Sequence, residues 1–245
     1  MKFIIVLALA ATAASSAKAS QVPQYNNGDL LLGFYDYSGG VTNDYVVDLG
    51  PISGFNLSSN FTLSLGLSTD LAHVFGSNWD TSGNIYFGLA ASYPLTAQVF
   101  ASNPNAGTPW TEAPAQGTPA SQVADIGNAY SLSTQANGET YSAGLQQADS
   151  SNNSWQSVAS NGLQNFYGGL GDGAISDVVT NSLEFDQVNV GSNGTPGTDL
   201  GSFSVSSAGN VSFTTAAVPE PSTFAAVGLG IAVLAVARRR RRSQA

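Results

Sequence analysis

Basic residues are missing from most of this sequence. Of 245 residues only seven are Lys or Arg, and all seven lie near the two ends. From residue 20 to residue 219 there is no Lys or Arg, whereas acidic residues run from Asp29 to Asp199. Nucleic acid is therefore a poor partner, because binding to phosphate depends on basic side chains. Ion pairs with Lys or Arg are excluded in the same region, and a form cut at both ends would be strongly acidic.

Cysteine is absent and histidine occurs once, as His73. Without disulfides, a folded region must be stabilised by apolar burial or bound ions. A Ser-His-Asp triad or an imidazole metal site would have to use His73, and the sequence contains no G-x-S-x-G motif. We therefore expect no catalytic site, and we expect His73 to be a half-buried structural residue at a strand end or in a turn.

Residues 1–19 have the three parts of a signal peptide. Lys2 is followed by an apolar run from Phe3 to about Ala14, and Ala17-Lys18-Ala19 then gives the small-x-small pattern that a signal peptidase recognises. We predict cleavage between Ala19 and Ser20. The alternative is an uncleaved membrane anchor, for which the apolar run is too short.

The C-terminal segment, residues 218–245, also has three parts in a fixed order. Pro219-Glu220-Pro221 is followed by an apolar stretch at about 223–237, which predicts a short single transmembrane helix. A basic cluster follows and predicts a cytoplasmic C-terminus. The basic residues are Arg238, Arg239, Arg240, Arg241 and Arg242.

This tail resembles the PEP-CTERM sorting tails of bacterial surface proteins. The resemblance implies recognition by an exosortase, a membrane protease or transpeptidase that cuts at or near the motif. It also implies transient anchoring in the inner membrane and a final place at the cell surface or in the extracellular matrix. A permanent single-span anchor is the alternative. Residues 28–50 and 197–203 are similar to a recurrent group of uncharacterised PEP-CTERM proteins, which brings no assigned activity.

Between the two ends, residues 20–217 have the pattern of an all-β domain. Short apolar runs at 30–35, 45–47, 61–65 and 84–89 are separated by turn signals. Residues 202–214 alternate around a central Ser-Ala-Gly, which predicts a hairpin that Leu183 and Phe185 extend. We predict a single β-sandwich or jelly-roll-like domain.

A long Pro-, Ser- and Asn-rich excursion interrupts this pattern. Pro104, Pro109, Pro114 and Pro119 recur every five residues, which favours an extended surface loop. Residues 121–160 contain few large apolar side chains, and we expect only weak helices at 141–148 and 155–166 in this part of the chain.

Calcium is the metal ion that the uncompensated acidity favours, because Ca²⁺ prefers oxygen ligands. Gly171-Asp172-Gly173 with Asp177 is a loop that offers such ligands. A solvated turn is the better interpretation, since the D-x-D-x-D-G pattern is absent. We expect no other cofactor.

Two further sets of residues are candidates for contact with glycans. Glu184 and Asp186 share a strand face and form the carboxylate pair to consider for a glycan hydrolase, although solvated edge charges explain them equally well. Aromatic side chains can stack on sugar rings, but packing in the core is their default role. The aromatic candidates are Tyr35, Tyr37, Trp79, Tyr86, Trp155 and Tyr167.

The pattern as a whole favours a non-catalytic surface or matrix component associated with exopolysaccharide in a biofilm. A carbohydrate-binding module is the first alternative, and a glycan hydrolase is the second. Exosortase and signal peptidase are the expected processing partners, with exopolysaccharide as the expected ligand.

The charge map predicts the outcome of a tryptic digest. Trypsin cuts after Lys and Arg, and the chain has no such residue between Lys18 and Arg238. We expect mass spectrometry to find no tryptic cleavage between residues 20 and 219, whatever the fold. Recovery of a tryptic peptide that begins or ends inside this region would contradict the prediction.

Overall fold

The structure is a computed structural model that describes residues 24–41, 43–93, 98–105, 107–112, 118–131, 134–135, 143–147, 154–161, 166–168, 171–172, 175–189 and 195–216. Most of its strands belong to one large antiparallel sheet. In chain order they are β1 (Asp29–Asp36), β2 (Asn43–Pro51), β3 (Phe61–Leu63), β4 (Ile85–Tyr93), β5 (Gln98–Asn103), β7 (Thr134–Gln135), β8 (Ala143–Gln147), β11 (Ser176–Val178), β12 (Ser182–Asn189), β13 (Thr198–Val205) and β14 (Val211–Thr215).

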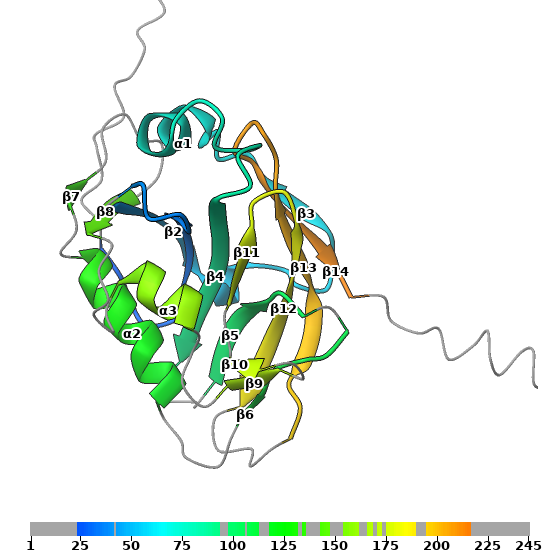
Figure 1. Cartoon of the computed structure of the whole chain (residues 1–245). Helices are drawn as coiled ribbons and strands as arrows, with labels where there is room; N and C mark the ends of the chain where they lie inside the picture. Colours follow the sequence, from blue (N-terminus) through cyan, green and yellow to red (C-terminus); the bar gives the residue numbers. More distant parts are fainter. Residues whose placement is uncertain are drawn as a thin grey trace, which may run out of the picture.

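The strand order in this sheet is β3-β14-β13-β12-β5-β4-β1-β2-β8-β7, and β11 pairs with β4 beside this path. A small second sheet has the order β10 (Gly171–Asp172), β9 (Phe166–Gly168) and β6 (Thr111–Glu112). The helices are the 3₁₀ turn η1 (Ile52–Gly54), α1 (Ser68–Phe75), α2 (Thr118–Ser131) and α3 (Trp155–Asn161). Figure 1 shows α2 and α3 at the left, near the end of the large sheet that contains β8 and β7, and β3 and β14 at the right, at its other end.

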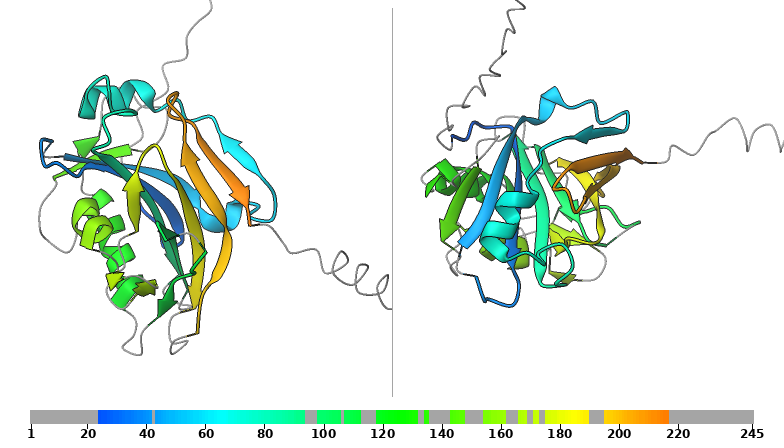
Figure 2. Two further views of the ribbon diagram at one scale, coloured as in Figure 1. Left: turned by 45° about the vertical axis from the view of Figure 1, so that its right-hand side comes forward. Right: turned by 90° about the horizontal axis from the view of Figure 1, so that it is seen from above.

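The large sheet curls, so that strands from both of its halves line one hydrophobic core (Figure 2). Phe34 of β1 and Phe87 of β4 contribute from one half, and Phe185, Phe203 and Phe213 contribute from the other. The rings of Phe185 and Phe203 meet edge to face, with centroids 5.0 Å apart. Such aromatic pairs add specific geometry to the apolar burial that stabilises the fold.

Strand β1 lies in the middle of this arrangement and is buried along its whole length. Leu30, Leu32 and Phe34 face the first core, whereas Leu31 and Tyr35 face a second core on the opposite side of the sheet. In a strand that is buried on both faces, apolar residues are favoured at every position instead of at every second one. The unbroken apolar sequence of β1 follows from this position.

Helices α2 and α3 cover the second core. Val123, Ile126 and Tyr130 of α2 and Trp155 of α3 are fully buried there. The indole of Trp155 lies against Gly33 of β1 so closely that a Cβ atom at that glycine would overlap the ring. Because Gly33 has no side chain, Trp155 of α3 can pack directly against the backbone of the sheet at this position.

The all-β prediction is confirmed by the curled antiparallel sheet. The hairpin predicted over 202–214 is present as β13 and β14, and β12 extends it. The helix expected at 155–166 is present as α3, over 155–161.

One prediction about the middle of the chain is wrong, and one helix there was not predicted. Residues 143–147 form β8 rather than a weak helix, because they complete the backbone pairing of β2. Helix α2 was not predicted, since its composition is polar and small. It begins at Thr118, directly before Pro119, and proline is well accommodated in the first helical turn.

The contact between Gly33 and Trp155 gives a test of the packing. We expect Gly33→Ala to lower the free energy of unfolding by about 1–3 kcal/mol, because an added methyl group overpacks a filled core. Gly54→Ala is the control: its Cβ atom would meet nothing within 4 Å, and the expected change is within about 0.5 kcal/mol. Urea unfolding measures both, and equal stability of the two variants would contradict the described packing.

Candidate functional site

Three tyrosines form a ladder from the core to the surface, here called the tyrosine ladder (Tyr35, Tyr86 and Tyr37). Tyr35 is buried in β1, and its ring centroid is 5.7 Å from that of Tyr86 on the neighbouring strand β4. Tyr86 stacks on Tyr37, with centroids 4.8 Å apart and planes inclined by 22°. Tyr37 is 63% exposed. The ladder therefore presents an aromatic ring to solvent on a rigid support.

Polar side chains lie beside the tyrosine ladder. Burial, followed by the negative charge of Asp177 and the neighbouring Tyr37, raises the pKa of Tyr86. Asp177 lies in β11, where its Oδ2 atom accepts a hydrogen bond of 2.8 Å from Asn181 Nδ2. Its Oδ1 atom accepts one of 2.7 Å from the backbone N–H of Val178. The carboxylate and the amide are thus held in place by hydrogen bonds, and Asp177 is close enough to Tyr86 to act on it through its charge.

Of the other aromatic candidates, Trp79, Trp155 and Tyr35 are buried, as the default interpretation predicted. Tyr167 lies in β9, and its side chain is outside the described residues. Trp110 is a further buried aromatic residue that sequence reasoning missed. Its Nε1 atom donates to the Ser102 carbonyl at 3.0 Å, and this bond ties the proline-rich segment to β5. That segment is therefore not solely a surface loop.

Glu184 and Asp186 lie on β12, inside the sheet between β5 and β13. Asp186 is fully buried, and its Oδ2 atom accepts hydrogen bonds from Asn103 Nδ2 at 2.8 Å and from the Trp110 backbone at 2.9 Å. Glu184 Oε1 accepts one of 2.6 Å from the backbone N–H of Gly107. Asp186 is therefore a buried residue and not a solvated edge charge, whereas Glu184 is half-buried on the same inner strand; both hold the 103–110 segment against the sheet.

A second carboxylate pair joins β1 and β2. Asp29 Oδ2 accepts a hydrogen bond of 2.7 Å from the Asn26 backbone, and Asp48 Oδ1 accepts one of 2.7 Å from that of Gly50. Burial raises the pKa of Asp48 to about 6, and the charge and hydrogen bond of the neighbouring Asp29 act in the same direction. Burial likewise raises the pKa of Asp186 to about 6, with contributions from Glu184 and Asp199.

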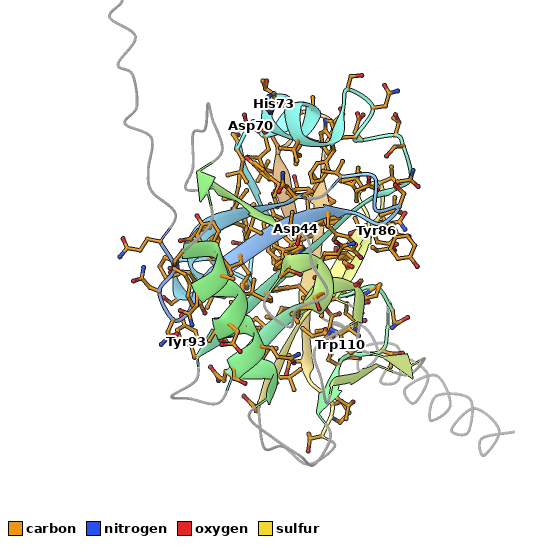
Figure 3. The ribbon with its side chains drawn as sticks, turned by 60° about the vertical axis from the view of Figure 1, so that its left-hand side comes forward. Asp44, Asp70, His73, Tyr86, Tyr93 and Trp110 are labelled. Atoms are coloured by element: carbon orange, nitrogen blue, oxygen red, sulfur yellow. The ribbon has the colours of Figure 1, made fainter. Side chains whose placement is uncertain are left out.

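His73 is exposed in the last turn of α1, so its expected position at a strand end, half-buried, is wrong. The same helix carries Asp70, which accepts a hydrogen bond of 3.3 Å from the Tyr45 hydroxyl. Burial raises the pKa of Asp70, and the nearby His73 opposes this shift. Figure 3 shows Asp70 and His73 together at one end of the molecule, away from Trp110.

The proposed calcium loop is divided between two sheets. Gly171 and Asp172 form β10 of the small sheet, whereas Asp177 belongs to β11 and pairs with β4. Gly173 lies outside the described residues. Within the part of the chain that the structure describes, no group of three or more His, Cys, Asp or Glu side chains is arranged to hold a metal ion.

Comparison with known protein families gives one match, to the PEP-CTERM protein-sorting motif, over residues 217–242. The comparisons with curated proteins and with solved structures give no match. The matched segment contains Pro219, Glu220, Pro221 and the arginines at 238–242, and it begins directly after the last described residue, Ala216.

The motif places the chain among exported proteins that carry a membrane-anchored C-terminal sorting signal. More particularly, residues 217–242 are a PEP-CTERM protein-sorting motif, which implies processing by exosortase.

The other predicted end features lie outside the described residues. These include Ala17, Ala19 and Ser20 of the signal cleavage site and the expected transmembrane helix at about 223–237. Across the described ranges, the helices are too short or too polar to span a bilayer. The domain boundaries after residues 19 and 217 stay predictions.

The buried carboxyls predict how stability depends on pH. In the folded state the pKa of Asp48 and that of Asp186 are about 6, above the usual 3.8, so the folded protein binds these protons more tightly than the unfolded chain. The stabilisation that comes from these two protonated carboxyl groups is complete below about pH 4 and is lost as the pH rises through about 6. As the pH rises from about 4 to about 8, we expect the free energy of unfolding to fall by about 1 kcal/mol or more for each of the two groups.

Urea unfolding at a series of pH values between about 4 and 8 measures this dependence. Asp48→Asn should flatten the profile, because an amide does not titrate. A wild-type stability that rises with pH across this range, or an unchanged profile in the variant, would contradict the assignment.

Proposed function

We propose that the domain is a non-catalytic component of the cell surface or extracellular matrix, and that it associates with exopolysaccharide through the tyrosine ladder. The observation that carries this proposal is the exposed ring of Tyr37, which stacks on Tyr86. The sorting motif supplies the supporting context, since it directs the protein towards the envelope, where polysaccharide is the abundant neighbour.

The geometry suits a saccharide for two reasons. An aromatic ring that is already stacked loses little conformational freedom when the apolar face of a sugar packs on it. The neighbouring carboxylate and amide offer acceptors and donors for hydroxyl groups, and their positions are fixed by hydrogen bonds. A surface patch of this kind is a contact site for one or two sugar units along a polymer.

Charge restricts which polysaccharide fits. Residues 20–219 contain acids but no Lys or Arg, so an anionic polymer would be repelled. A neutral polymer is the favoured ligand. An acidic one would bind only with cations that screen or bridge the two negative charges.

The non-catalytic part of the proposal is supported by the state of the carboxylates. Glu184 and Asp186, the pair considered for glycan hydrolysis, accept backbone and amide hydrogen bonds within the sheet. A general acid and its partner must instead reach a glycosidic bond in an open cleft. The carbohydrate-binding alternative differs from the leading proposal only in selectivity for one glycan, and the tyrosine ladder serves both.

Tyr37→Ala tests the proposal. We expect this variant to lose most of its retention on the organism's own exopolysaccharide, by roughly 5-fold to 10-fold, because stacking on an aromatic ring contributes about 1 kcal/mol or more. Tyr37→Phe is the matched control and should keep retention, since it preserves the ring. Affinity electrophoresis on neutral and acidic polymers measures both.

Because Tyr37 is exposed, its removal should leave thermal unfolding unchanged, which separates lost binding from lost folding. Substitution of the buried Trp79 or Trp155 would disturb the core instead, so those variants do not test the site. Equal retention of the wild type and Tyr37→Ala, or no retention of the wild type on any polymer, would overturn the proposed contact.

A further inference from the structure

Two carboxylate oxygens on β12 are buried and have no hydrogen-bond donor. They are Oδ1 of Asp186 and Oε2 of Glu184, and the other oxygen of each carboxylate is the one that accepts the bonds from the 103–110 segment. β12 pairs with β5 without a register shift at these two residues, although its pairing with β13 shifts between Phe185 and Asp186, so the two side chains leave the same face of the sheet. Their unbonded oxygens therefore belong to one region.

This region has an excess of negative charge. Asp199 of β13 lies directly opposite Asp186 in the strand register, and both Glu184 and Asp199 act on Asp186 through their charges. No Lys or Arg between residues 20 and 219 is available to neutralise them. A buried carboxylate oxygen without a partner is costly, and native proteins satisfy such atoms with water, a proton or an ion.

A divalent cation satisfies this pair better than a proton does. A single proton on Asp186 neutralises one carboxylate and leaves the charge of Glu184 in place. One divalent ion contacts an oxygen from each carboxylate and balances both charges. Calcium is the favoured ion, because it accepts irregular sets of oxygen ligands, whereas magnesium requires near-octahedral geometry and keeps its water. Zinc and copper are disfavoured, since the chain has no cysteine and its single histidine lies on α1.

We propose that Asp186 Oδ1 and Glu184 Oε2 bind a calcium-type divalent cation, which fastens the 103–110 segment to the sheet. This site differs from the calcium loop considered at 171–177, and it is independent of glycan binding at the tyrosine ladder. Two carboxylates leave the remaining coordination positions to backbone carbonyls and water. The affinity should therefore be modest, with Kd of roughly 10⁻⁴–10⁻³ M, as in extracellular calcium modules.

The test is thermal unfolding of the purified full chain at neutral pH, in a chelator and with CaCl₂ added. At about ten times Kd, calcium should raise Tm by roughly 3–5 °C. Asp186→Asn and Glu184→Gln should each abolish this shift. Asp125→Asn, at an exposed acid on α2, is the matched control and should keep it.

Terbium, a luminescent substitute for calcium, provides a second measurement. The backbone N–H of Trp110 bonds to Asp186, so the indole is close enough to sensitise terbium emission. Emission that calcium displaces, and that Glu184→Gln lacks, would support the site even if Asp186→Asn does not fold.

Two results would overturn the proposal. One is the absence of any calcium-dependent shift in the wild type, which would leave protonation as the way these oxygens are satisfied. The other is an equal shift in all three variants, which would mean that calcium only screens the general negative charge of the domain.

Discussion

The absence of Lys and Arg from the folded region is the constraint on which the rest of the structure depends. The buried carboxylates of the described residues have no Lys or Arg as a partner, and most of their hydrogen bonds come from backbone N–H groups and side-chain amides. Asp36 accepts bonds from the backbone of Ser38 and Val41 and so closes the turn after β1. Asp44 of β2 accepts the N–H of Gln156 at the start of α3. Hydrogen bonds to a charged acceptor are stronger than those between neutral groups.

Acidic side chains in this protein therefore fix turns and segment ends through hydrogen bonds, instead of forming ion pairs with Lys or Arg at the surface. Asp44 fixes where α3 begins, and Asp186 fixes where the segment after β5 turns back towards the sheet. The apolar residues form two cores, one on each face of the large sheet. The negative charge that surface ion pairs would balance stays unbalanced, and the proposed binding of cations and neutral polymers is based on it.

Strands were predictable from the sequence where apolar residues follow a simple pattern. The apolar run of β1 reflects burial on both faces, and the alternation in β13 and β14 reflects burial on one face. Both patterns can be read directly from the order of the residues. Helix α2 and strand β8 were not predicted: α2 is rich in small and polar residues apart from the buried Val123, Ile126 and Tyr130, and β8 takes its structure from its pairing with β2. Tertiary contacts with β2, β4 and the second core decide their conformation.

The candidate sites show the same division. The sorting motif was predictable because recognition by a processing enzyme reads a linear segment. The aromatic list contained Tyr37 and Tyr86, but their stacking depends on the pairing of β1 with β4, and the burial of Trp79 and Trp155 depends on the two cores. Glu184 and Asp186 were noted as neighbours, whereas their burial depends on β5 and the Trp110 segment, which lie 70 or more residues earlier in the chain.

Strand β14 ends at Thr215, and the backbone of Ala216 still bonds to Leu200 of β13. The Pro-Glu-Pro motif begins three residues later, a span of at most about 10 Å for any chain. An enzyme that cuts at the motif must therefore work almost in contact with the folded domain, at the end of β14. Either its active site opens widely enough to admit a folded neighbour, or cleavage precedes the closing of β14 onto β13, in which case processing and folding compete in time.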